Sequence, residues 1–193
     1  PTPQPSHTNV NHIIISEVQL TGGPGKTAND FIELYNPTDS AVDISGWRLR
    51  KRTSSGSESS VRVFGSGKII PARGFFLWAN SSEGFAGSLA ADESSTATIA
   101  ANNSIALLNG EEVIDAVAWG ENLQNPFGEG ISIVAILEDG QSYERKVWQD
   151  ACISAQGAGE PLGNGCDTSN NASDFEIRSI SNPQNSQNQI EPN

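Results

Sequence analysis

The stretch DFIELYNPTDSAVDISGWRL, residues Asp30–Leu49, decides the fold of this chain. Its first half places the apolar residues Ile32 and Leu34 at alternate positions, which is the period of a β-strand. A polar run around Pro37 follows, and proline disfavours helix at the residue before it. Apolar residues then return up to Trp47. The pattern predicts two strands joined by a tight reversal.

Short runs of the same kind recur along the chain, and no stretch keeps the 3.6-residue period of a helix. Turn signals separate the runs. Asn109-Gly110 and Asp139-Gly140 are the strongest, because a two-residue hairpin needs the positive φ that these residues tolerate. Many short strands at this spacing predict an all-β sandwich or barrel. We expect strands near 13–20, 30–36, 42–52, 59–64, 68–79, 97–100, 104–108, 112–119, 131–137, 142–147 and 174–178.

Several motifs resemble those of the lamin-tail domain family. The opening motifs are I-S-E-V at Ile15–Val18, D-F-I-E-L-Y-N-P-T-D at Asp30–Asp39 and V-D-I-S-G-W-R-L at Val42–Leu49. Later motifs lie at Ile70–Leu77, Asn103–Gly110, Val113–Gly120, Tyr143–Arg145, Asp174–Phe175 and Asn182–Asn185. The resemblance covers about Ile13 to Asn185 and is to the type found in exported bacterial and archaeal proteins. It implies an immunoglobulin-like β-sandwich.

The chain is predicted to be one domain with two tails, since 193 residues suit a single core. Residues 1–11 are proline-rich and are expected to be a linker, and residues 186–193 form an Asn/Gln-rich flexible tail. The sandwich domain occupies 12–185. Within it, the segment 149–173 is longer and more polar than the family pattern needs, which predicts a local elaboration near the C-terminus.

The apolar strand runs predict the core. Ile32, Leu34, Trp47 and Trp119 all lie in such runs, where a sandwich needs bulky side chains. We expect Trp47 and Leu34 to be buried across the sandwich from the strand over 75–77.

The charge of the chain restricts its partners. The net charge is −12 and the pI is near 4.4, whereas nucleic-acid binders need clustered lysine and arginine to release counterions. We therefore expect no nucleic-acid partner. The basic cluster at Arg48–Arg52 is interpreted as a soluble sheet edge, and a patch for phosphate or acidic ligands is the alternative. No run approaches the roughly 18 apolar residues of a membrane span.

Two cysteines, Cys152 and Cys166, flank a glycine-rich loop in the polar elaboration. A zinc site would need four ligands, and the two histidines lie far away in the N-terminal arm. The spacing favours a disulfide, which would stabilise the fold by about 3 kcal/mol; two unpaired thiols are the alternative. A disulfide indicates an oxidising compartment, outside the cell or at its surface.

The loop after Cys166 is the candidate metal site. Asp167, Ser169 and Asn171 offer oxygens at alternate positions, and Asp174 adds a further carboxylate. Hard cations such as calcium prefer oxygen ligands of this kind. The spacing is not that of an EF-hand. The alternative is a loop of Asx-turns, in which these side chains accept hydrogen bonds from nearby backbone N–H groups.

Enzymatic chemistry has weaker support. The sequence has no G-x-S-x-G nucleophile elbow, and both histidines lie in the N-terminal arm. Glu17 and Glu33 would be an acid–base pair if their strands were neighbours. The alternative is that each caps a sheet edge or forms a structural bridge with Arg48 or Arg145. We expect no enzymatic activity.

Trp148 lies beside polar residues at the start of the elaboration, and we interpret it as an exposed platform for a sugar ring. Together these features predict a non-enzymatic interaction or scaffold module of a larger exported protein, at the cell surface or outside the cell. Its partners would be other domains or proteins there, and calcium is the one cofactor considered. The alternative is a carbohydrate- or calcium-binding module appended to a secreted enzyme.

Overall fold

The fold is given by a computed structural model that describes residues 10–157, 163–188 and 190. The predicted linker over 1–11 lies outside the described residues except for its last two positions. The predicted tail over 186–193 is described in part.

Strands dominate the described chain, and the helices are single turns. The strands are β1 (Ile14–Gln19), β2 (Phe31–Tyr35), β3 (Val42–Asp43), β4 (Arg48–Thr53), β5 (Glu58–Val63), β6 (Ile69–Ile70), β7 (Phe75–Asn80), β8 (Glu93–Ser95), β9 (Asn103–Asn109), β10 (Glu112–Ala118), β11 (Ser142–Arg145), β12 (Val147–Trp148), β13 (Cys152–Ile153) and β14 (Phe175–Arg178). The helices are η1 (Ser82–Gly84), α1 (Phe85–Ser88) and α2 (Asn171–Asp174).

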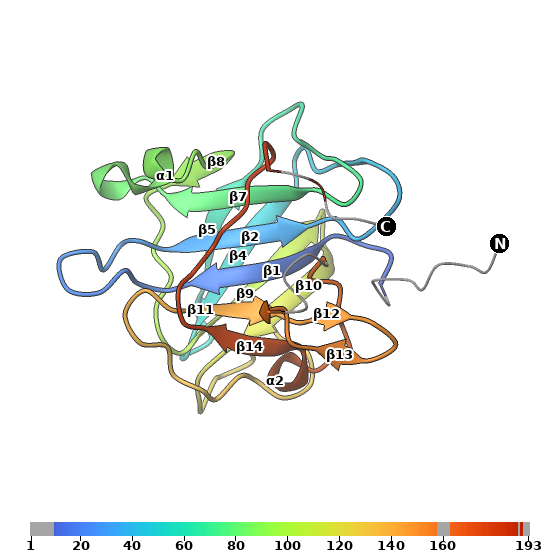
Figure 1. Cartoon of the computed structure of the whole chain (residues 1–193). Coiled ribbons are helices and arrows are strands. Elements are labelled where there is room, and N and C mark those ends of the chain that lie inside the picture. Colours follow the sequence, from blue (N-terminus) through green and yellow to red (C-terminus); the bar gives the residue numbers. More distant parts are fainter. Residues whose placement is uncertain (1–9, 158–162, 189, 191–193) are drawn as a thin grey trace.

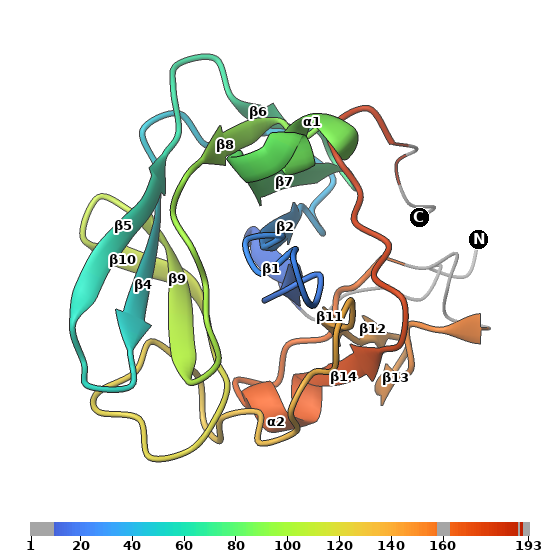
Figure 2. The same ribbon diagram turned by 90° about the vertical axis from the view of Figure 1, so that its left-hand side faces the viewer.

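Two sheets face each other across the core (Figures 1 and 2). The larger sheet has the strand order β14-β11-β1-β2-β7-β8, and the smaller has the order β10-β9-β4-β5. The strands pair antiparallel except for β7 with β8. Two further pairs, β12 with β13 and β3 with β6, lie outside these sheets. The arrangement is an immunoglobulin-like β-sandwich, as the sequence predicts.

The core lies between the two sheets and is built from the inward side chains of both. Ile32, Leu34 and Trp119 are buried in it. Trp47 is only partly buried and packs against its edge, just before β4. Leu34 pairs with Phe76 of the neighbouring strand in the same sheet. The expectation that Leu34 lies across the sandwich from that strand is therefore wrong.

Several predicted strands differ from the observed ones. The expected strand over 68–79 is divided into β6 and β7 by a turn in which the Gly74 N–H donates to the Pro71 carbonyl. The expected strand over 42–52 is divided into β3 and β4 by a turn, in which the Trp47 N–H donates to the Ile44 carbonyl and Gly46 has positive φ. The segments 97–100 and 131–137 form no strand. Ile99 instead donates its N–H to the Asp30 carboxylate, over 2.7 Å.

The outer face of the larger sheet is also covered, so that every residue of β1, β2 and β7 is buried. Helix α1 packs on one part of this face through Ala86. Residues 179–188, which we call the C-terminal strap, cross it from β14 towards α1 (Figure 1). Along this path Ser181 donates to Gln19, and Asn185 donates to the carbonyl of Leu89.

Candidate functional site

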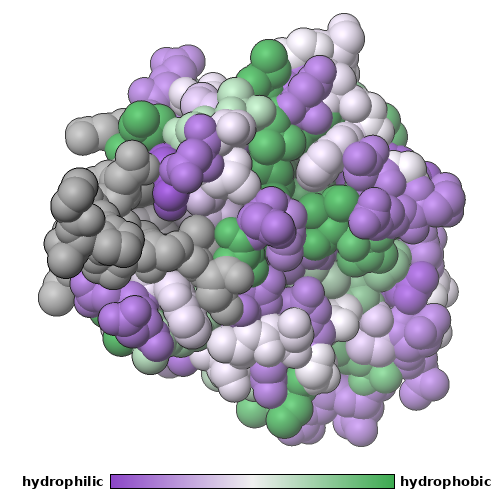
Figure 3. Space-filling model, turned by 90° about the vertical axis from the view of Figure 1, so that its right-hand side faces the viewer, coloured by the Kyte–Doolittle hydropathy of each residue, from purple (hydrophilic) through white to green (hydrophobic). Residues whose placement is uncertain are grey.

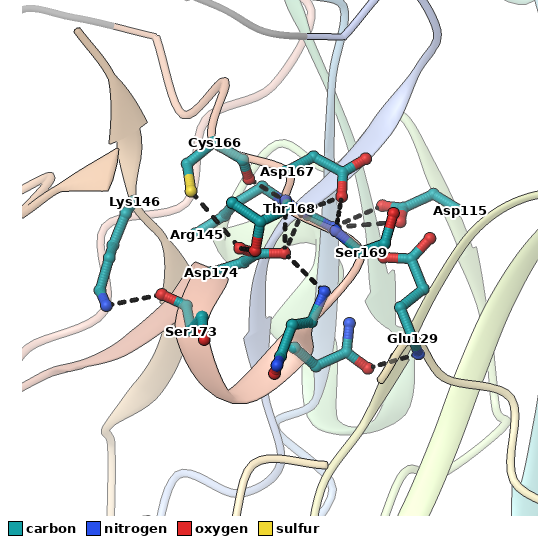
Figure 4. Close-up of polar contacts among 12 residues, drawn as sticks. Asp115, Glu129, Arg145, Lys146, Cys166, Asp167, Thr168, Ser169, Ser173 and Asp174 are labelled. Atoms are coloured by element: carbon teal, nitrogen blue, oxygen red, sulfur yellow. Dashed lines mark hydrogen bonds and ion pairs between the residues drawn. The ribbon is translucent and has the colours of Figure 1, made fainter. Parts of the chain in front are cut away.

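Arg145, the last residue of β11, lies at the centre of a buried polar network (Figure 4). Its side chain has no exposed surface. Two guanidinium nitrogens donate to the carbonyls of Ile15 and Cys166, over 2.8 and 3.0 Å. The third donates to both carboxylate oxygens of Asp115, over 2.9 and 3.1 Å. The guanidinium also lies 4.6 Å from the centre of the Phe175 ring. The network therefore provides hydrogen-bond acceptors and a counter-charge for the fully buried guanidinium of Arg145.

The pair formed by Arg145 and Asp115 joins the two sheets, because Asp115 belongs to β10 of the smaller sheet and Arg145 to the larger. Asp115 also accepts the N–H of Ile15, in β1, over 2.5 Å. A β-bulge lies next to it, where the pairing of β10 with β9 shifts between Val113 and Asp115. Bulges re-aim side chains, and here the shift leaves Val113 exposed and Asp115 in the core.

The disulfide between Cys152 and Cys166 is formed, with the two Cα atoms 5.5 Å apart and a sequence separation of 14. The predicted pairing is confirmed. It joins β13 to the loop that precedes α2, both within the elaboration. The carbonyl of Cys166 is one of the acceptors of Arg145. The loop is thus closed covalently by the disulfide and anchored to the sandwich through the buried network.

The structure places Asp167 and Asp174 of the predicted calcium set near Arg145, at 3.8 and 3.9 Å from its guanidinium. Asp174 accepts the N–H and hydroxyl of Thr168, over 3.0 and 2.5 Å, and the N–H of Asn170, over 3.2 Å. Asp167 accepts the N–H of the residue two positions on. This is the geometry of the Asx-turn alternative.

Asn171 is tied to the sandwich rather than turned towards this loop. Its side-chain oxygen accepts the N–H groups of Ala118 and Glu129, and its amide donates to the carbonyl of Ala116, all over 3.0 Å. Ser169 has φ of 57° and donates its N–H to Asp167. The four predicted ligands are therefore not gathered around one point.

A different set of carboxylates is close together. Oxygens of Asp115, Glu129 and Asp167 lie within 4.8 Å of one another. The pKa of Glu129 is raised to about 8, mainly by burial and in addition by the neighbouring Asp115 and Asp167 carboxylates. These groups can share protons or face a cation, with Arg145 supplying the positive charge present in the structure. Asp115 in the apolar run VIDAVAW is the sequence signal that points to this network.

Three glutamates form a row on the outer face of the larger sheet, beneath the C-terminal strap. In the strand register Glu17 lies opposite both Glu33 and Glu144. Asn182 and Gln184 of the strap donate backbone N–H groups to Glu17 and Glu33, over 3.2 and 2.5 Å. We call Glu17, Glu33 and Glu144 the glutamate row.

The glutamate row shows that the strands of Glu17 and Glu33 are neighbours. Neither residue pairs with Arg48 or Arg145; the cation beside the row is Arg178, 2.7 Å from Glu144. Burial raises the pKa of Glu17 to about 7 and the pKa of Glu33 well above its usual value, and like charge within the row adds to both shifts.

A cavity of about 290 Å³ opens at the end of the sandwich where β1 and β10 finish. We call it the end cavity. Trp119 and Tyr143 form part of its wall, with their ring centres 6.0 Å apart. The other lining residues are Leu20, Thr21, Thr27, Ile99, Ala100, Ala101, Asn102, Gly120, Ala135, Ile136 and Leu137.

The opposite end of the molecule, on the side of β12 and β13, shows hydrophobic residues in separate patches between hydrophilic ones (Figure 3). Trp148 lies in β12, opposite Cys152, and is partly exposed. The side chain of the residue predicted to bind a sugar ring is therefore available at the surface.

Two packed antiparallel sheets with a mixed pairing at one edge define a protein of the immunoglobulin-like class. A family model, the Lamin Tail Domain, matches residues 6–121, which is more than half of the chain. The chain belongs to the lamin tail domain family. The family is one of non-catalytic modules of immunoglobulin-like type and indicates protein interaction.

The family match ends before β11, β14 and the disulfide. The last three of the later motifs, at Tyr143–Arg145, Asp174–Phe175 and Asn182–Asn185, lie outside the matched range. No curated protein matches the sequence. Among the described residues, no helix is long and apolar enough to cross a membrane.

Proposed function

We propose that this domain is a non-enzymatic interaction module of a larger protein that is exported from the cell. The observation that carries the proposal is the disulfide between Cys152 and Cys166 in an immunoglobulin-like fold. Disulfides persist in oxidising compartments and are rare in the cytosol. Membership in a family of interaction modules supports the proposed interaction role.

The roles of the buried carboxylates also support a non-enzymatic module. Asp115 holds the two sheets together through Ile15 and Arg145. Glu17 and Glu33 hold the C-terminal strap. Each of these acids has a structural role, because its carboxylate accepts hydrogen bonds that hold parts of the fold together.

The compartment is tested on the full-length protein in its own cells. External protease on intact cells, with thiol labelling before and after reduction, should digest the domain and label Cys152 and Cys166 only after reduction. A protease-resistant protein with two reactive thiols before reduction would overturn export.

The interaction role is tested by cross-linking intact cells and mapping the peptides joined to this domain. Cross-links should join the domain to other surface proteins or to other domains of the same protein. Cross-links confined to the domain itself would contradict the proposal.

Enzymatic activity is tested by a phosphoesterase, esterase and glycosidase screen. The screen should give no turnover. Turnover that is lost in Glu33→Gln, and kept in the exposed control Glu112→Gln, would show that the domain is an enzyme.

Carbohydrate binding is a second candidate, favoured by the partly exposed indole of Trp148. Its test is retention on insoluble polysaccharide. Retention that disappears in Trp148→Ala, with the circular dichroism spectrum unchanged, would establish this role.

Calcium binding stays a prediction. The melting temperature at millimolar calcium, compared with excess chelator, tests it directly, because a ligand that binds only the native state raises stability with occupancy. Asp167→Asn should remove any rise that calcium causes. An unchanged melting curve would leave the Asx-turn interpretation of the loop.

A further inference from the structure

We propose that the end cavity binds one apolar side chain of an extended partner peptide that carries lysine or arginine beside that side chain. This inference rests on the proposed interaction function and specifies the chemistry of the partner. It is carried by the wall of the cavity, by the exposed segment at its rim and by the charges next to the rim.

The wall of the end cavity is apolar, and its aromatic polar groups are already satisfied. The Trp119 indole N–H donates to the carbonyl of Ala100 over 3.0 Å. The Tyr143 hydroxyl donates to the carbonyl of Ala135 over 2.6 Å. None of the lining residues is an acid or a base, although the chain has 23 acidic residues. The wall therefore favours an uncharged, apolar group.

The size of the cavity suits a single side chain. Its volume is about 290 Å³, whereas an apolar cavity of about 150 Å³ is enough to bind benzene. Sites for complete drug-sized ligands run from about 300 to 1,000 Å³, so this cavity lies at the small end of that range. An isoleucine, leucine or phenylalanine side chain fits between these limits.

The segment 134–137 at the rim favours a peptide over a free small molecule. Val134 and Ile136 are 62% and 86% exposed. Within the described part of the chain, the backbone N–H groups of 134–137 form no hydrogen bond. Peptides dock on such unpaired backbone through main-chain hydrogen bonds, while pockets receive their side chains. A small molecule inside the cavity would use neither feature.

The charges beside the rim favour a basic partner. Glu121 follows the lining residue Gly120, and Glu138 and Asp139 follow Leu137. All three carboxylates are exposed, and none forms an ion pair with a described residue. The cations in the same neighbourhood are Lys26, next to the lining residue Thr27, and Lys51, which donates to the carbonyl of Thr98 beside the lining residue Ile99. The excess of negative charge attracts lysine or arginine and makes binding weaker at high salt.

The test uses three blocked pentapeptides, with sequences KKLKK, KKAKK and EELEE, added to the isotope-labelled chain. The indole N–H signal of Trp119 in proton–nitrogen NMR spectra reports occupation of the cavity. KKLKK should shift this signal and bind at least about tenfold more tightly than either other peptide, which corresponds to 1.4 kcal/mol. Equal binding of KKLKK and KKAKK would overturn the role of the cavity.

Two variants and their matched controls locate the site. Ala135→Trp adds an indole at the cavity mouth, at an exposed position, and should abolish the binding of KKLKK. Ala41→Trp, also exposed but far from the lining residues in sequence, should leave it unchanged. The double change Glu138→Gln with Asp139→Asn should weaken binding and reduce its salt dependence. The same neutralisation at Glu111 and Glu112 should not.

The rival occupant is a free apolar molecule, and toluene is its probe. Toluene that shifts the Trp119 signal while no peptide does so would overturn the proposal in favour of a small-ligand cavity. Peptide and toluene both without effect would overturn it as well. In either case, cross-links from other surfaces of the domain on intact cells would still support the interaction function. Failure of the cavity proposal is therefore distinguishable from failure of the proposed function.

Discussion

At the scale of single residues, the most consequential group is Arg145. A buried ion pair gains little over a well-packed apolar pair, but removing one partner leaves an uncompensated charge in the core. Here the charge left behind would include Asp115, which has no exposed surface in its side chain. The same guanidinium also satisfies two carbonyls, so its loss affects β1 and the disulfide-bonded loop together.

We expect Arg145→Met to lower the free energy of unfolding by about 3–5 kcal/mol, since it keeps the side-chain volume and removes the charge. Urea denaturation followed by fluorescence measures this loss. The control is Arg48→Met, whose partner Glu111 is 97% exposed and whose loss should cost less than about 1 kcal/mol. A similar cost for both variants would show that the buried network does not hold the sheets together.

At the scale of elements, sequence patterns locate most strands but not the irregularities that build the site. Alternation finds β2, and Asn-Gly finds the hairpin of β9 and β10. Alternation misses the bulge in β1, where Ser16 is the extra residue between Ile15 and Glu17 in the pairing with β2. The bulge depends on partners distant in the sequence, and so does the burial of Asp115. Local periodicity carries no information about either.

The segments 97–100 and 131–137 show the same limit. Both are apolar and short, so periodicity predicts strands. In the structure the first is held by the carboxylate of Asp30 and the second makes a single bridge, between Ile133 and Trp119. Both line the end cavity. A short apolar segment can be a strand or can line a cavity without pairing to a neighbouring strand. A sequence window cannot distinguish these two cases.

The glutamate row predicts a pH dependence of stability. Because the pKa of Glu17 is raised from 4.5 to about 7 in the native state, that state holds a proton that the unfolded chain has already lost at intermediate pH. The contribution is full below pH 4.5 and is lost as the pH rises through about 7. Glu17→Gln mimics the protonated form, so it should flatten this fall and gain on the order of 3 kcal/mol relative to wild type at pH 8.

Denaturation of both proteins between pH 4 and 8 measures this difference. The difference is needed because burial also raises the pKa of Asp30 to about 7, which contributes to the slope of both proteins. The exposed Glu112→Gln serves as the control and should follow wild type. Parallel curves for Glu17→Gln and wild type would show that the pKa of Glu17 is not raised in the native state.

The C-terminal strap gives a second prediction at this scale. Removing residues from Ser181 onward uncovers the glutamate row, since Asn182 and Gln184 supply its backbone donors. Water then solvates the carboxylates, and the pKa of Glu17 should fall towards 4.5. Carbon-detected NMR titration of the glutamate carboxyls measures the shift. A titration near pH 7 in the truncated chain would mean that the sheet, and not the strap, raises the pKa.

At the scale of the whole molecule, the resemblance in the sequence predicts the sandwich, and the spacing of two cysteines predicts the disulfide. The family match covers only residues 6–121. The larger sheet nevertheless needs β11 and β14 from beyond that range. Motifs such as D-F-I-E-L-Y-N-P predict the first half of the fold well. The second half depends on Arg145, whose role appears only when strands distant in sequence are brought together.

Reduction of the disulfide should destabilise the molecule by about 3 kcal/mol, the value expected from loop entropy for a closed loop of this size. Thermal melting with and without a reducing agent measures the effect, and mass spectrometry verifies the thiol state. Cys152→Ser with Cys166→Ser should match the reduced protein. A melting temperature that reduction leaves unchanged would show that the Arg145 network alone anchors the loop.

The position of β1 in the larger sheet affects the order in which the strands pair during folding. One neighbour, β2, follows it closely, but the other, β11, comes much later, and Ile15 and Arg145 are 130 residues apart. Pairings across such distances slow folding, because loop closure precedes the gain from contact. During synthesis β1 therefore waits with one edge unpaired until most of the domain has been made. A chain crossing a membrane during that interval would still be unfolded.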